Sequence, residues 1–203
     1  MAPVRFADAL FEQTFVYRLA QWPFAADKLA PLLARQDLRR ARRVLDVGCG
    51  PGTNAALFAH AEYAGIDINP RYIAWARGRY GREFVVADIR THEFPADQTF
   101  DFVLVNSFLH HLTDEEAGRV LKAVARVVSP GGFAHILDLV LPEKPSAARW
   151  LAHHDRGQHA RPLDAWRALF SSVFDVAAFE PYAVSLLGVP LWHMVYCKGQ
   201  AKP

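Results

Sequence analysis

The chain has 203 residues, of which 52% are hydrophobic and 22% are charged, and its formal net charge is +2. This composition is typical of a globular protein with one full core, and it excludes long disordered stretches. The small net charge argues against a nucleic-acid partner. No run of 18 apolar residues predicts a membrane span, and charges scattered through the N-terminus exclude the apolar core of a signal peptide.

The two cysteines are too few for a disulfide framework. Cys49 lies in a glycine-rich turn and Cys197 in a strand-like run, so both are expected to be small buried residues in a reducing compartment. The sequence therefore predicts a cytoplasmic protein.

The predicted elements begin with two amphipathic segments before residue 43. Their apolar positions are Phe11, Phe15, Val16, Leu19 and Trp22 in the first, and Leu29, Leu32 and Leu33 in the second. From residue 43 to about 140, short apolar runs alternate with helix-like segments, which predicts parallel βαβ units. The expected strands are Arg43–Val47, Tyr63–Ile66, Phe84–Ala87, Phe100–Val105 and Phe133–Leu139.

Helix signals separate these strands. Thr53–Phe58 is expected to start a helix, and Asn69-Pro70 opens another that Gly78 and Gly81 are expected to end. Thr113-Asp114-Glu115-Glu116 is a capping box before an apolar stripe at helical spacing. The remaining predicted features are a turn at Ser129-Pro130-Gly131-Gly132, an irregular stretch at 142–162, a helix at Leu163–Phe170, and strands near Val173–Pro181 and Leu191–Cys197.

The most informative segment is the string Val44-Leu45-Asp46-Val47-Gly48-Cys49-Gly50-Pro51-Gly52-Thr53. An apolar strand enters a turn with glycines at alternate positions. Glycines there allow positive φ and remove the Cβ atoms that would block a ligand lying on the backbone. A glycine-rich turn alone is also compatible with a purely structural role.

Acidic residues at neighbouring strand ends strengthen the ligand interpretation. Asp67 ends the second strand about 20 residues after Asp46, where a carboxylate can accept both hydroxyls of a ribose. Asp88 ends the third strand and can accept a hydrogen bond from an adenine amine. In an open α/β sheet the carboxyl edge of the strands is where ligands bind.

The strings VLDVGCGPGTNA, YAGIDINP, FVVADI, FDFVLVNSFLHHL and SPGGFAHILDLV follow one another in this order. Together they resemble the class I S-adenosylmethionine-dependent methyltransferase family, in its small-molecule (methyltransferase type 11/25-like) branch, over roughly residues 41–140. The resemblance implies a Rossmann-like, doubly wound α/β fold with a seven-stranded, mostly parallel sheet whose last strand, Leu191–Cys197, is antiparallel. It also implies S-adenosylmethionine as cofactor, S-adenosylhomocysteine as product and a small-molecule methyl acceptor.

The resemblance also implies roles for individual residues. Gly48, Cys49, Gly50 and Gly52 would line the methionine part of the cofactor, and Asp46 would approach its amino group. Asp67 and Ile68 would hold ribose and adenine, Asp88 and Ile89 the adenine edge, and Asn106 and Ser107 would lie by the methionine moiety. The turn is GxGxG rather than the GxGxxG of dinucleotide sites, which favours the methyl donor over a nicotinamide cofactor.

The resemblance divides the single domain, 1–203, into three parts. Residues 1–42 form a helical lid, 43–140 the cofactor-binding core and 141–203 the substrate side. In the lid, Tyr17 and Arg18 are the candidates for contact with the cofactor. The alternative, which the sequence favours slightly, is that Tyr17 packs on the sheet and Arg18 is solvated.

His110 and His111 are the candidates for acid–base catalysis because they follow the fourth strand and imidazole titrates near neutral pH. A structural or cofactor-contact role is the alternative, and His111 is expected to face the cleft. A base is needed only if the acceptor arrives protonated. No metal is expected, since His153, His154, Asp155 and His159 match no standard ligand spacing.

Two other functions remain open from the sequence. A protein that binds S-adenosylmethionine without transferring its methyl group would keep the same motifs. An NAD(P)-dependent oxidoreductase would share the strand–turn–acid pattern. The oligomeric state and the acceptor atom are not encoded in any of these features.

Overall fold

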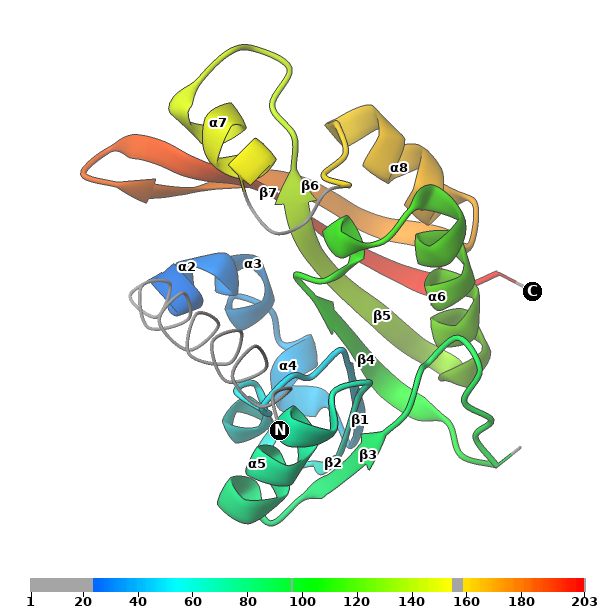
Figure 1. Ribbon diagram of the computed structural model, residues 1–203. Helices are drawn as coiled ribbons and strands as arrows, with labels where there is room; N and C mark the ends of the chain where they lie inside the picture. The colour runs from blue at the N-terminus through cyan, green and yellow to red at the C-terminus, as the bar shows by residue number, and fades with distance from the viewer. Residues whose placement is uncertain (1–23, 96, 155–158, 203) are drawn as a thin grey trace, which may run out of the picture.

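The computed structural model describes residues 24–95, 97–154 and 159–202, and in this part seven strands form one sheet in the order β3-β2-β1-β4-β5-β7-β6 (Figure 1). The strands are β1 (Arg43–Val47), β2 (Glu62–Asp67), β3 (Glu83–Val86), β4 (Phe100–Asn106), β5 (Val128–Val140), β6 (Phe174–Leu186) and β7 (Val189–Ala201). Strands β1 to β5 pair in parallel, and β7 is antiparallel to both of its neighbours. The predicted doubly wound fold, with an antiparallel last strand, is confirmed.

Helices cover both faces of this sheet. They are α2 (Ala25–Lys28), α3 (Ala30–Leu33), α4 (Asp37–Arg40), α5 (Pro70–Tyr80), α6 (Asp114–Val127), α7 (Ala147–His154) and α8 (Leu163–Ser171), with 3₁₀ turns η2 (Ala55–Phe58) and η3 (Leu109–His111). Buried residues of α6 and α8 join one core cluster, those of α3 and α5 join a second, and Ala152 of α7 joins a third, smaller cluster with residues of β5, β6 and β7 (Figure 1). Coverage on both sides explains why the central strands are nearly unbroken apolar runs.

Two helix starts follow their predicted caps. The Asn69 side chain accepts from the Arg71 amide at 3.0 Å, and Thr113 accepts from the Glu116 amide at 3.3 Å in a complete capping box. Helix α5 ends at Gly81, whose φ of 58° is left-handed. The expectation that Gly78 also ends this helix is wrong, because Gly78 lies inside it.

The expected helix at Thr53–Phe58 is also wrong. Only the short 3₁₀ turn η2 forms there, with the Ala55 amide donating to the Gly52 carbonyl three residues earlier. Strand β2 begins at Glu62, so the chain has room for one turn and no full helix. Free amides of a regular helix therefore do not follow the glycine turn.

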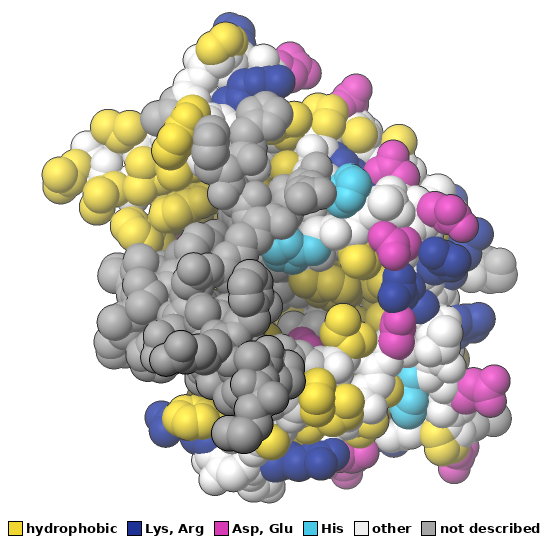
Figure 2. Space-filling view, in the orientation of Figure 1, with side chains coloured by type: hydrophobic (Ala, Val, Ile, Leu, Met, Phe, Trp, Pro, Cys, Tyr) yellow, Lys and Arg dark blue, Asp and Glu magenta, His cyan; other side chains and the backbone are white. Residues whose placement is uncertain are grey.

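The C-terminal strands extend beyond their predicted ends. Strands β6 and β7 form a hairpin closed by Leu187 and Gly188, with φ of 50° and 81°, as a two-residue type I′ turn requires. Hydrophobic side chains gather at the hairpin tip, where Leu186, Leu187 and Val189 are exposed (Figure 2). Strand β5 likewise starts at Val128 and includes the predicted turn at 129–132, where its register with β4 shifts between Phe100 and Phe102.

The first amphipathic segment and the lid residues Tyr17 and Arg18 lie outside the described residues. In the second segment Leu29 and Leu32 are buried, whereas Leu33 is exposed. None of the helices in the described part of the chain has the length and apolar character needed to cross a membrane.

Candidate active site

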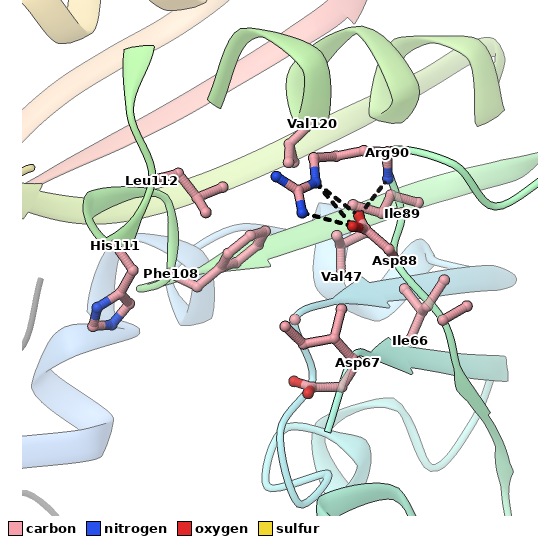
Figure 3. Close-up of a pocket in the computed structure, with 13 residues that line it drawn as sticks. Val47, Ile66, Asp67, Asp88, Ile89, Arg90, Phe108, His111, Leu112 and Val120 are labelled. Atoms are coloured by element: carbon pink, nitrogen blue, oxygen red, sulfur yellow. Dashed lines mark hydrogen bonds and ion pairs between the residues drawn. The ribbon is translucent and has the colours of Figure 1, made fainter. Parts of the chain in front are cut away.

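A cavity of about 250 Å³ opens at the carboxyl edge of the parallel strands (Figure 3). Its walls come from the ends of β1, β2 and β3, from the segment after β4 and from α6. The lining residues are Val47, Gly48, Ile66, Asp67, Ile68, Ala87, Asp88, Ile89, Arg90, Phe108, His111, Leu112 and Val120. The chain therefore places a pocket where open α/β sheets bind ligands.

Gly48 forms part of this pocket at the start of the glycine turn. Gly48, Gly50 and Gly52 all have positive φ, at 69°, 54° and 75°. A Cβ on Gly48 would lie 2.6 Å from Cδ1 of Phe108, and one on Gly52 would lie 2.8 Å from the Phe84 ring. Gly48 therefore lines the pocket, whereas Gly50 and Gly52 determine the course of the turn without lining the pocket.

Asp67 lies in the pocket at the end of β2. Its Oδ2 accepts from the Gly50 amide at 2.9 Å, and its Oδ1 accepts from the Asn69 amide at 2.8 Å. One carboxylate therefore joins the glycine turn to the start of α5. Ile68 beside it is 68% exposed, so its apolar surface is available to a ligand.

Asp88 faces the pocket from the end of β3, next to the buried Ile89. The backbone N, Nε and Nη2 of Arg90 donate to its two oxygens over 2.7–3.0 Å. These hydrogen bonds hold the pKa of Asp88 below its usual value. Sequence analysis missed Arg90, although an arginine two residues after a strand-end acid was a signal.

Asp46 is fully buried beneath the glycine turn and is not part of the pocket lining. Its Oδ2 accepts from Tyr63 Oη at 2.7 Å and from Asn54 Nδ2 at 3.2 Å, while Oδ1 has no hydrogen-bond partner among the described residues. Burial raises its pKa to about 7. Cys49 is buried nearby as a free thiol, against the position where Gly65 lacks a side chain.

Asn106 and Ser107 end β4 beside the pocket without lining it. Ser107 has a φ of 56°, its amide donates to Leu137 at 2.8 Å and its hydroxyl donates to Asn106 Oδ1 at 3.0 Å. This left-handed residue turns the chain so that Phe108 enters the pocket wall.

The two histidines occupy different environments on turn η3. His111 is exposed and lines the pocket (Figure 3), whereas His110 is 4% exposed and its Nδ1 lies 2.6 Å from Asp138 Oδ1. Asp138 Oδ2 also accepts from the Leu109 amide at 2.9 Å. Asp138 is thus a buried support of the turn.

Arg161 is a second support that sequence analysis missed. It is 5% exposed, and its Nη1 and Nη2 donate to the carbonyls of Leu109 and Leu112 at 3.1 and 2.7 Å. Its Nε donates to Asp114 at 2.6 Å, and its guanidinium lies 4.8 Å from the Trp166 ring centre. No sequence signal marked it, because its partners are about 50 residues away.

His135, a polar residue on β5, does not line the pocket. His135 is buried, with Nδ1 at 2.8 Å from Tyr196 Oη, and burial lowers its pKa to about 3. Within the described residues, no group of three His, Cys, Asp or Glu residues could hold a metal ion. Asp155 lies outside those residues.

Comparison with known proteins gives consistent results. A family profile described as a methyltransferase domain matches residues 44–132. A trans-aconitate 2-methyltransferase from Variovorax paradoxus is 29% identical over 81% of this chain and 65% of that protein. One from Escherichia fergusonii is 35% identical over 59% of this chain and 48% of that protein. The chain thus spans less than two thirds of these curated relatives.

Solved structures agree on the fold. The PH0226 protein of Pyrococcus horikoshii OT3 superposes with a TM-score of 0.72 at 22% identity, covering 90% of this chain and 92% of that one. The N-methyltransferase NodS of Bradyrhizobium japonicum WM9, in complex with S-adenosyl-L-homocysteine, gives 0.69 at 17% identity, covering 89% of each chain. The chain therefore contains a segment, residues 44–132, that matches a methyltransferase domain, and it shares the fold of these solved structures.

Proposed function

We propose that the protein is an S-adenosylmethionine-dependent methyltransferase (EC 2.1.1.-) that transfers a methyl group to a small-molecule acceptor by in-line displacement. The observation that carries the proposal is the pocket itself, which joins Gly48, Asp67 and Asp88 at the carboxyl edge of the sheet. S-adenosylhomocysteine is the expected product.

The residues present fit this cofactor. A cavity of about 250 Å³ is slightly smaller than the roughly 300–1,000 Å³ typical for drug-sized ligands, so it suits the nucleoside portion. Asp67 with Ile68 would hold ribose and adenine, and Asp88 with Ile89 the adenine edge. The methionine portion would then lie over the glycine turn (Gly48, Cys49, Gly50 and Gly52), near Asn106 and Ser107.

The buried carboxyl of Asp46 favours a cationic group at the methionine end of the cofactor. Its Oδ1 is buried and without a partner among the described residues, so an ammonium group, directly or through a water molecule, would satisfy it. The lid residues Tyr17 and Arg18 belong to the same proposal, as does the division into lid 1–42, core 43–140 and substrate side 141–203.

When bound, the cofactor supplies a methyl group on a sulfonium. The protein then needs chiefly to position the acceptor and exclude water, which can provide much of the rate acceleration. His111 is the candidate general base for an acceptor that arrives protonated, because it is the exposed histidine on the pocket. His110, held by Asp138, would serve that turn as a support.

The proposal also includes a first methyl acceptor to test and a cellular location. The names of the curated relatives make trans-aconitate the first acceptor to assay. A cytoplasmic location is supported by the two buried free cysteines. The small net charge supports an acceptor other than nucleic acid.

Calorimetry with S-adenosylhomocysteine and, separately, with NADH tests the cofactor. We expect binding of the first and none of the second; the reverse result would identify an oxidoreductase. A radiolabelled methyl-transfer assay with trans-aconitate and other small acids, phenols and amines then tests turnover. Binding of S-adenosylhomocysteine without transfer to any acceptor would instead identify a non-catalytic binding protein.

A further inference from the structure

Arg90 connects two walls of the pocket that come from distant parts of the chain. On one side it holds Asp88, at the end of β3, through three donor groups. On the other side its Nη1 donates to Glu116 Oε1, in the first turn of α6, at 2.8 Å. Figure 3 shows the guanidinium between Asp88 and Val120, with both residues on the pocket.

The network continues beyond Glu116. Its other oxygen, Oε2, accepts from the backbone amide and the hydroxyl of Thr113, each at 3.1 Å. Thr113 caps α6 directly after the turn that carries His111 and Leu112. Through Glu116, Arg90 therefore contacts the start of α6, next to the pocket residues His111 and Leu112.

The number of hydrogen bonds on Asp88 gives this arrangement a chemical consequence. An ionised carboxylate offers about four acceptor positions. Three different N–H groups of Arg90 donate to the two oxygens, and Nε is shared between both, so at most about one position is left for a ligand. The side chains of Asp88 and Arg90 are each a little under one-third exposed, so their charge-assisted bonds are partly shielded from water.

We infer that Arg90 sets the nucleobase selectivity of this pocket by holding Asp88 so that one carboxylate position accepts from the base. The inference rests on the proposed function. Arg90 is a positioning residue here: it acts on the base through Asp88 and does not need to touch the reacting atoms. Adenine has an amine that donates to such an acceptor, whereas hypoxanthine has a carbonyl oxygen at the same position, which a carboxylate repels.

The test measures dissociation constants for S-adenosylhomocysteine and S-inosylhomocysteine by calorimetry. For the unaltered chain we expect the adenine compound to bind at least about tenfold more tightly, as one charge-assisted hydrogen bond allows. In Arg90→Gln we expect this preference to fall about tenfold, mostly through weaker binding of the adenine compound. A merely structural loss would weaken both compounds equally and leave the ratio unchanged, which overturns the inference.

Two further variants separate the arms of the network. Glu116→Gln keeps the helix cap, because its carbonyl can still accept from Thr113, but it replaces the carboxylate that Arg90 contacts. We expect a smaller fall in the preference, in the same direction; this variant decides the question if Arg90→Gln does not fold. Arg90→Lys keeps the charge without the fork of parallel N–H groups and should restore the preference only in part.

Arg126→Gln is the matched control, since it removes one positive charge from an exposed position in the last turn of α6. It should leave both constants unchanged; a fall in the preference equal to that of Arg90→Gln would show a general charge effect and overturn the inference. If the unaltered chain binds neither compound, the proposed function fails and the inference falls with it. Binding of S-adenosylhomocysteine with no preference between the bases overturns the inference alone.

Discussion

Two turns at the carboxyl edge of the sheet are held in different ways. The glycine turn after β1 is fixed by backbone amides, since Gly48 and Cys49 donate to the Ile66 carbonyl and Gly50 donates to Asp67. The histidine turn η3 is fixed by buried side chains, Asp138 and Arg161, that lie 28–52 residues further along the chain. The first turn depends on the adjacent strand and on the charges beneath it, whereas the second depends on distant tertiary contacts.

The largest effect we expect concerns the buried carboxyl below the glycine turn. Burial, and less strongly the charge of Asp67, raises the pKa of Asp46 to about 7, against hydrogen bonds from Tyr63 and Asn54 that lower it. The folded state therefore binds this proton more tightly than the unfolded chain. The resulting stabilisation is complete below about pH 4 and is lost as the pH rises to about 7, by up to about 4 kcal/mol.

Urea unfolding of the unaltered protein and of Asp46→Asn between pH 5 and pH 8 measures this loss. We expect the free energy of unfolding of the unaltered protein to fall relative to that of the variant as the pH rises. Tyr63→Phe removes a hydrogen bond that favours the ionised carboxylate, so it should move the loss to higher pH. Parallel pH curves for the unaltered protein and Asp46→Asn would contradict this account.

The histidine turn should respond to the loss of its arginine instead. Arg161→Met leaves the carbonyls of Leu109 and Leu112 without their donor, which we expect to lower the free energy of unfolding by about 3 kcal/mol. Urea denaturation at one pH measures it. Arg126→Met, at an exposed position of α6, should change stability by no more than about 0.5 kcal/mol. Equal effects of the two variants would show that Arg161 is not a support of this turn.

The same difference explains how much the sequence could predict. The strands from residue 43 to 140, the glycine turn and the positions of Asp67 and Asp88 follow from local patterns, because strand ends and turn residues are adjacent in sequence. The expectation of a seven-stranded sheet with an antiparallel last strand comes from the family resemblance instead. Arg161 could not be found this way, since nothing near it in sequence reveals that it contacts the turn at 109–112. The missing helix after the glycine turn has a similar cause: the early start of β2, set by pairing with β1, overrides the local helix signal.

A third experiment tests the glycine turn through ligand binding. Asp67→Ala should weaken S-adenosylhomocysteine binding about a hundredfold, because it removes charge-assisted hydrogen bonds to the ribose and the acceptor that holds Gly50. Calorimetry measures the dissociation constant of S-adenosylhomocysteine. Asp67→Asn keeps one acceptor oxygen, so its dissociation constant should lie between those of the unaltered protein and Asp67→Ala. Unchanged affinity in a folded Asp67→Ala protein would count against the cofactor site.

The smallest effect is expected at His111 when the acceptor is a carboxylate. A carboxylate such as trans-aconitate is ionised at neutral pH and needs no base, so His111→Ala should lower kcat by less than about threefold once its methyl transfer is detected. A hydroxyl acceptor arrives protonated, and for it the same change should lower kcat by about a hundredfold or more and remove the ionisation of a base from the pH profile. His111 lines the pocket, whereas His110 is buried against Asp138. His110→Gln should therefore lower the free energy of unfolding and leave kcat with either acceptor nearly unchanged. A large loss of kcat with a carboxylate acceptor and an unchanged KM would show that His111 orients the acceptor, whatever its protonation.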